Sequence, residues 1–132
     1  MDIDTYQDQA MATAFVQDFD SDVSHFGFGL MSEAGEVAGI FQKYYRCDPK
    51  YNRWGDEVFF EQALNNLDMV DWAGFTPEAQ DKLKSELGDV LWHLAAVAST
   101  FGLKLSEVAE HNVEKLAKRT ADGTIKGDGD NR

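Results

Sequence analysis

A chain of 132 residues, 43% hydrophobic and 12% aromatic, is long enough to bury a core, and we expect one domain over residues 1–132. Its formal net charge of −12 argues against nucleic acid or an anionic membrane as a partner, because a broadly acidic surface repels polyanions. Cys47 is the single cysteine, no stretch reaches transmembrane length and the acidic N-terminus lacks an apolar leader, so we expect a reducing, cytoplasmic location.

The first half of the chain is expected to form two helices. The first runs from about Thr5 to Asp18. The second runs from about His25 to Arg46, and Ser24 is its candidate N-cap. Because the two prolines fall outside the strongly periodic segments, an all-α fold is expected.

An irregular connector follows at about residues 47–75, with a short helix expected near Glu57 to Leu67. Such a segment is expected to dock on its own core, on a partner chain or on a base. Its aromatic side chains are Tyr51, Trp54, Phe59, Phe60, Trp72 and Phe75.

The third expected helix opens at Thr76, with a proline at its first position, and ends near Thr100 or Phe101, where Gly102 is a plausible stop. Ser106 is the candidate N-cap of a fourth helix that continues to about Arg119. A glycine-rich tail occupies about residues 121–132. It is either a frayed end or a segment that brings Lys126 or Arg132 to a phosphate.

One short phrase occurs twice, at Leu30–Val37 and again at Leu83–Val90, with Leu, Ser, Glu, Gly and Val in register. Each copy holds two carboxylates three residues apart on one helical face, at the border of an apolar stripe. The acidic residues are Glu33, Glu36, Glu86 and Asp89, and the stripes are Leu30, Ala34, Val37 and Phe41, then Leu83, Leu87, Val90 and Leu94.

Two such helices packed face to face would gather four carboxylates, which is unfavourable unless a cation lies among them. The sequence therefore predicts an Mg²⁺ site, with Mn²⁺ as a substitute, and phosphate chemistry. The alternative for a single Glu-x-x-Glu pair is a solvated helix face. Gly35 and Gly88, between the acids, indicate close helix packing or room for a ligand.

A second signal lies on the last helix, where Asn112, Lys115 and Arg119 share one face and have the chemistry to hold phosphate oxygens. The alternative is ordinary salt bridging on that helix, for instance from Glu114 to Lys118. His93 follows the second acidic pair and is either a packing residue or a residue that faces the site.

Four segments together resemble the MazG-like family of nucleoside triphosphate pyrophosphohydrolases, in short phage-type form. They are Leu30–Val37, Glu86–Leu94, Asn112–Arg119 and Gly127–Arg132. The resemblance implies a four- to five-helix all-α fold, a homo-oligomer (dimer or tetramer), host cytoplasm for a phage-encoded chain, and Mg²⁺-dependent cleavage of a (deoxy)nucleoside triphosphate to the monophosphate and pyrophosphate.

The resemblance also assigns roles. Metal ligation and catalysis fall on Glu33, Glu36, Glu86 and Asp89, and substrate binding falls on Asn112, Lys115 and Arg119. The chain departs from the family at Ser32, where a further Glu is common, and in its long segment between the acidic pairs. Two alternatives stay open: a pyrophosphohydrolase for phosphoribosyl-ATP or an alarmone, and a non-catalytic acidic module that binds a protein.

Overall fold

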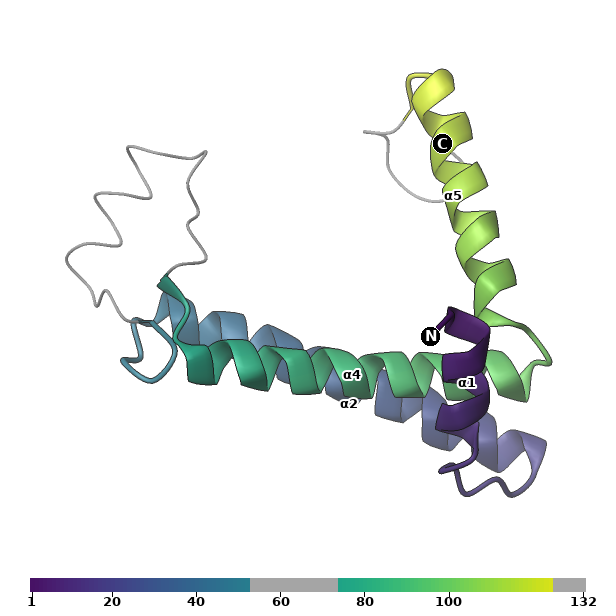
Figure 1. Cartoon of the computed structure of the whole chain (residues 1–132), viewed down its shortest axis with the longest axis horizontal. Helices are drawn as coiled ribbons and strands as arrows, with labels where there is room; N and C mark the ends of the chain where they lie inside the picture. Colours follow the sequence, from purple (N-terminus) through teal and green to yellow (C-terminus); the bar gives the residue numbers. More distant parts are fainter. Residues whose placement is uncertain (53–73, 125–132) are drawn as a thin grey trace. The chain divides into compact units, whose positions relative to one another are not determined.

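The structure, a computed structural model, describes residues 1–52 and 74–124. This part contains helices and an isolated bridge between Asn52 and Phe75, so the predicted all-α class is confirmed (Figure 1). None of the helices in it is long and apolar enough to cross a membrane. The helices are α1 (Ile3–Met11), α2 (Phe19–Tyr45), α4 (Pro77–Thr100) and α5 (Leu105–Ala121).

The chain divides into two compact units. The terminal unit comprises Met1–Val23 and Ala95–Arg132, and the hairpin unit comprises Ser24–Leu94. The expected helix at Glu57 to Leu67 lies outside the described residues, as do the side chains of Trp54, Phe59, Phe60 and Trp72.

The boundary between the first two helices differs from the prediction. α1 ends at Met11, and α2 already begins at Phe19. The cause is Asp18, whose carboxylate accepts hydrogen bonds from the Ser21 backbone N–H at 3.0 Å and from the Ser21 hydroxyl at 2.7 Å. Asp18 thus caps α2, and the prediction that Ser24 caps this helix is wrong.

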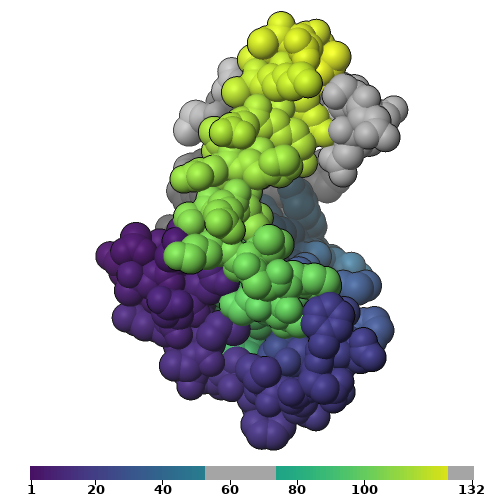
Figure 2. Space-filling model, turned by 90° about the vertical axis from the view of Figure 1, so that its right-hand side faces the viewer, coloured from purple at the N-terminus to yellow at the C-terminus, as the bar shows by residue number. Residues whose placement is uncertain are grey.

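Gln7 holds the terminal unit together from α1. Its side chain is buried and donates to the Ser99 hydroxyl at 2.8 Å and to the Leu103 carbonyl at 2.9 Å. Its amide oxygen accepts the Leu105 backbone N–H at 2.8 Å. One side chain therefore satisfies groups at the end of α4 and at the start of α5, and Figure 2 shows the purple N-terminal segment against the green start of α5.

The start of α5 also corrects a prediction. Lys104 is the N-cap residue, and Glu107 accepts its backbone N–H at 3.2 Å. Ser106 lies inside the helix, where its N–H and hydroxyl donate to the Asp4 carboxylate at 3.0 and 2.8 Å. An acid from α1 thus takes the capping role that the sequence alone assigned to Ser106.

α2 and α4 run antiparallel in the hairpin unit (Figure 1). Their core joins both helices to the ends of the connector, because Tyr51 and Phe75 are buried within it. Phe75 stacks on Tyr44, with ring centroids 4.4 Å apart. Of the three expected docking partners of the connector, its own core is therefore the one that these two aromatics contact. The buried cluster is Ile40, Tyr44, Tyr51, Phe75 and Ala79.

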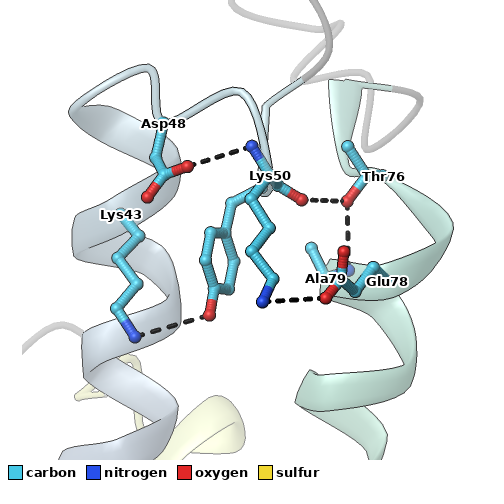
Figure 3. Close-up of polar contacts among 7 residues, drawn as sticks. Lys43, Asp48, Lys50, Thr76, Glu78 and Ala79 are labelled. Carbon is cyan, nitrogen blue, oxygen red and sulfur yellow. Dashed lines mark hydrogen bonds and ion pairs between the residues drawn. The ribbon is translucent and has the colours of Figure 1, made fainter.

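Polar contacts fasten the same end of the hairpin (Figure 3). Thr76 caps α4 as predicted, since its hydroxyl accepts the Ala79 backbone N–H at 3.1 Å. The Thr76 hydroxyl also donates to the Lys50 carbonyl. The Lys50 ammonium lies 2.9 Å from the Glu78 carboxylate. The segment after α2 is thereby tied to the first turn of α4.

The predicted apolar stripe of α4 is only partly buried. Leu87 and Leu94 are 51% and 37% exposed, whereas Glu86, which directly precedes Leu87, is 5% exposed. The buried face of α4 is therefore shifted from the leucine stripe toward the acids. This shift carries Glu86 into the interface between the two helices.

Candidate metal centre

The two copies of the duplicated phrase meet across the α2–α4 hairpin. Glu33 of α2 and Glu86 and Asp89 of α4 each offer one carboxylate oxygen, and these oxygens lie within 4.8 Å of one another. Glu33 is half-buried, Glu86 is buried and Asp89 is exposed. The expected convergence of acids from both copies is therefore present for three side chains, which we call the acidic cluster.

Glu36 is not a member of the acidic cluster. It lies one turn beyond Glu33 on α2, and its side chain is exposed. It still acts on the same region, because its charge contributes to raising the pKa of Lys82. Glu36 is thus close enough to the cluster to share its electrostatic field.

Lys82 lies at the acidic cluster and was not among the predicted site residues. Its ammonium donates a hydrogen bond to the Glu86 carboxylate, one helical turn away. This hydrogen bond is the main reason that the pKa of Lys82 lies above its ordinary value of 10.5, and the Glu86 charge adds to it. The only sequence signal is a basic residue four positions before an acid of the duplicated phrase.

The donor set of the acidic cluster fits a hard divalent cation. Mg²⁺ prefers oxygen ligands at about 2.1 Å in an octahedron, so opposite ligands stand about 4.2 Å apart. The 4.8 Å limit on the three carboxylate oxygens is close to that span. Glu86 is also buried with a cation as its partner, as a carboxylate requires when it leaves water. Glu33, Glu86 and Asp89 would hold the metal.

The glycines of the duplicated phrase are not needed for close packing within the chain. A Cβ built on Gly35 or Gly88 meets no atom within 4 Å, which leaves room beside the carboxylates. The close approach occurs instead at Gly29, where a Cβ would lie 2.1 Å from Cε1 of His93. His93 therefore packs against α2, and its Nδ1 is buried without a hydrogen-bond partner among the described residues.

The predicted substrate-binding residues lie on α5, in the terminal unit. Arg119 is buried, Lys115 is half-buried and Asn112 is exposed. Lys115 also lines a cavity of about 320 Å³, with His111, Glu114 and Lys118. Glu114 and Lys118, both in the described part of α5, do not form an ion pair with each other, which was one instance of the salt bridging considered for this helix.

Two comparisons with known proteins give a match. A family model described as "MazG nucleotide pyrophosphohydrolase domain" matches residues 26–124, which include the whole acidic cluster. The chain is also 35% identical to the "Gene 37 protein" of Mycobacterium phage L5 over 137 residues, covering 100% of both sequences. No solved structure gives a significant match.

Proposed function

The chain belongs to the family of MazG nucleotide pyrophosphohydrolase domains, and from this premise we propose that it hydrolyses (deoxy)nucleoside triphosphates to nucleoside monophosphates and pyrophosphate with the help of Mg²⁺. The observation that carries the proposal is the meeting of Glu33, Glu86 and Asp89 from two copies of one phrase. Three carboxylates so close together need a compensating cation. A divalent metal supplies one and also neutralises a triphosphate.

The proposed mechanism gives each group of residues one task. A bound divalent ion supplies Lewis-acid chemistry and a more acidic water. Glu33, Glu86 and Asp89 would hold the ion, and Glu36, the fourth carboxylate nearby, would serve as a further ligand or as a proton acceptor. These assignments carry the metal-binding roles of the family over to the matching residues of this chain.

Phosphate binding is assigned to Asn112, Lys115 and Arg119 on α5. Amide, ammonium and guanidinium groups hold phosphate oxygens by charge-assisted hydrogen bonds, and Arg does so with two N–H groups at once. Their cationic members would stabilise the charge that develops on the leaving pyrophosphate. Lys115 supports this assignment, since it lines a cavity on α5.

The substrate proposal is tested with purified protein, Mg²⁺ (or Mn²⁺) and a panel of ribo- and deoxyribonucleoside triphosphates, extended by phosphoribosyl-ATP and a guanosine alarmone. We expect a nucleoside monophosphate and pyrophosphate in equal amounts. Release of orthophosphate would contradict the cleavage position. Turnover of phosphoribosyl-ATP or the alarmone alone would favour the related pyrophosphohydrolase, and no product with any compound would favour a non-catalytic acidic module.

We also propose that the chain forms a homo-oligomer, a dimer or a tetramer. Large apolar side chains are exposed on the hairpin unit, namely Phe28 (72%), Met31 (71%), Leu87 (51%) and Leu94 (37%). With 100° per residue, Met31 and Leu87 fall on the flanks of α2 and α4 away from the acids. Exposed apolar surface of this kind supports association with a second copy through that flank.

A further inference from the structure

We propose that Lys82 is the resident cation of the acidic cluster, that a divalent metal displaces its ammonium from Glu86, and that the released ammonium then binds an anionic phosphate oxygen in the cavity beside it. This inference rests on the proposed function, because it concerns the same site. It adds a residue outside the duplicated phrase and a coupling between metal binding and phosphate binding.

The first observation is the asymmetry of the Lys82–Glu86 pair. The Glu86 side chain is 7% exposed, whereas the Lys82 side chain is 47% exposed. A buried carboxylate needs a compensating partner, while a lysine at this exposure can return to water. The ion pair therefore mainly stabilises the buried carboxylate of Glu86, and Lys82 is the partner that can leave the pair for water.

The second observation is that ordinary helix stabilisation does not explain the pair. In an i, i+4 ion pair on a helix, the favourable order places the acid before the base. Here Lys82 precedes Glu86, which is the weaker order. The ammonium also responds to Glu36 on α2, which contributes to its raised pKa. Lys82 thus compensates charge from both helices, as a metal at this site would.

The third argument is that a divalent ion and the Lys82 ammonium cannot both bind Glu86. A divalent ion held by Glu86 would stand next to the ammonium that now bonds the same carboxylate. Two cations at such a distance repel each other strongly in a partly buried site. Metal binding therefore requires Lys82 to move away, and its four-carbon stem allows a large change of position.

Lys82 also lines a cavity of about 330 Å³, and the ammonium released from Glu86 can turn into this cavity. Its other lysine, Lys50, is already held by Glu78 at 2.9 Å (Figure 3). Lys82 would therefore bring an uncommitted positive charge into this cavity. Its lining residues are Lys50, Tyr51, Glu78, Asp81, Lys82 and Ser85.

The predicted signature is a pair of opposite effects from one substitution. In Lys82→Met the ammonium no longer competes with the metal, so the protein should bind Mn²⁺ roughly fivefold more tightly than the wild type, measured by electron paramagnetic resonance. With Mg²⁺ saturating, the same variant should bind pyrophosphate roughly fivefold more weakly by calorimetry, since a phosphate ligand is missing. A merely structural lysine would not change the two affinities in opposite directions.

Two further variants keep the test decisive. Lys84→Met removes an exposed lysine from the same helix and should leave both affinities unchanged. Lys82→Arg keeps a cation at the position, so it should bind Mn²⁺ no more tightly than the wild type, and it answers the case in which Lys82→Met fails to fold. Unchanged or weaker Mn²⁺ binding by folded Lys82→Met, or tighter Mn²⁺ binding by Lys82→Arg, would overturn the inference.

Failure of the inference differs from failure of the proposed function. If the wild type binds Mn²⁺ and Glu86→Gln does not, but Lys82→Met behaves as the wild type, only the role of Lys82 is refuted. If the wild type itself binds no Mn²⁺, the metal site is refuted as well.

Discussion

Asp18 shows how a single side chain can move a helix boundary. The hydrogen bonds from the Ser21 hydroxyl and backbone N–H hold the pKa of Asp18 below its ordinary value of 3.8. Because the folded pKa is lower than the unfolded one, this stabilisation is complete above the unfolded pKa and is lost as the pH falls through the lowered folded value. The N-cap of α2 is thus sensitive to acid.

This cap can be tested by Asp18→Asn, which keeps an acceptor oxygen but does not titrate. We expect the variant to lose less thermal stability than the wild type as the pH falls below about 4, the ordinary range of an Asp carboxyl group. Circular dichroism melting curves over that range measure the difference. Asp20→Asn, in the same first turn, is the control and should follow the wild type. If the thermal stability of Asp18→Asn fell with pH as steeply as that of the wild type, the capping role of Asp18 would be excluded.

Gly29 and Gly27 form a matched pair within α2. A Cβ at Gly29 would lie 2.1 Å from the His93 ring, whereas one at Gly27 meets nothing within 4 Å. Gly27→Ala should therefore stabilise the helix by up to about 1 kcal/mol, while Gly29→Ala forces His93 to shift and should destabilise by about 1–3 kcal/mol. Urea unfolding of both variants measures the difference. Equal effects would show that α2 and α4 do not approach closely here.

The duplicated phrase predicted that four acids come together, and the structure brings Glu33, Glu86 and Asp89 together but not Glu36. That these acids bind a metal stays a prediction. Lys82 was missed because its role depends on the burial of Glu86, which no local pattern encodes. The roles of Asn112, Lys115 and Arg119 in substrate binding stay predictions.

At the scale of elements, the presence of each helix was easier to predict than the residues at which it begins and ends. The start of α4 at Thr76 and its end before Gly102 follow from local capping signals, and Gly102 has a φ of 67°, as a helix stop requires. The start of α5 could not be read from Ser106, because its partner Asp4 comes from α1, which is distant in sequence. Caps supplied by another helix leave no local signature.

The largest change in stability at the scale of elements is expected from substitution of Gln7. Gln7→Leu would leave the Leu103 carbonyl and the Leu105 N–H without their present partner, and it would also remove the bond to Ser99. We expect a loss of about 2–4 kcal/mol in the free energy of unfolding, because buried unsatisfied groups are expensive. Chemical denaturation provides the measurement. Gln9→Leu, exposed on the same helix, should stay within about 0.5 kcal/mol of the wild type. A similarly small effect of Gln7→Leu would contradict its linking role.

For the whole molecule, the two flanks of the hairpin unit present opposite chemistry. One side carries the acidic cluster, and the 100° spacing turns the exposed side chains of Met31 and Leu87 away from the acids of their own helices. If the apolar flank joins copies of the chain, Leu87→Lys should lower the mass found by sedimentation at micromolar concentration, because a charge is costly in an apolar interface. Lys84→Ala on the same helix should keep the wild-type mass. A monomeric wild type would refute the oligomer.

The central claim is that the duplicated phrase builds one metal site from two helices, and a calorimetric Mg²⁺ titration of four proteins tests it most directly. The account predicts that the wild type binds Mg²⁺, that Glu33→Gln and Glu86→Gln each weaken this binding at least about tenfold, and that Glu78→Gln, an exposed acid of α4 paired with Lys50, binds as the wild type does. Unchanged binding in either Glu33→Gln or Glu86→Gln would contradict a site shared by the two copies.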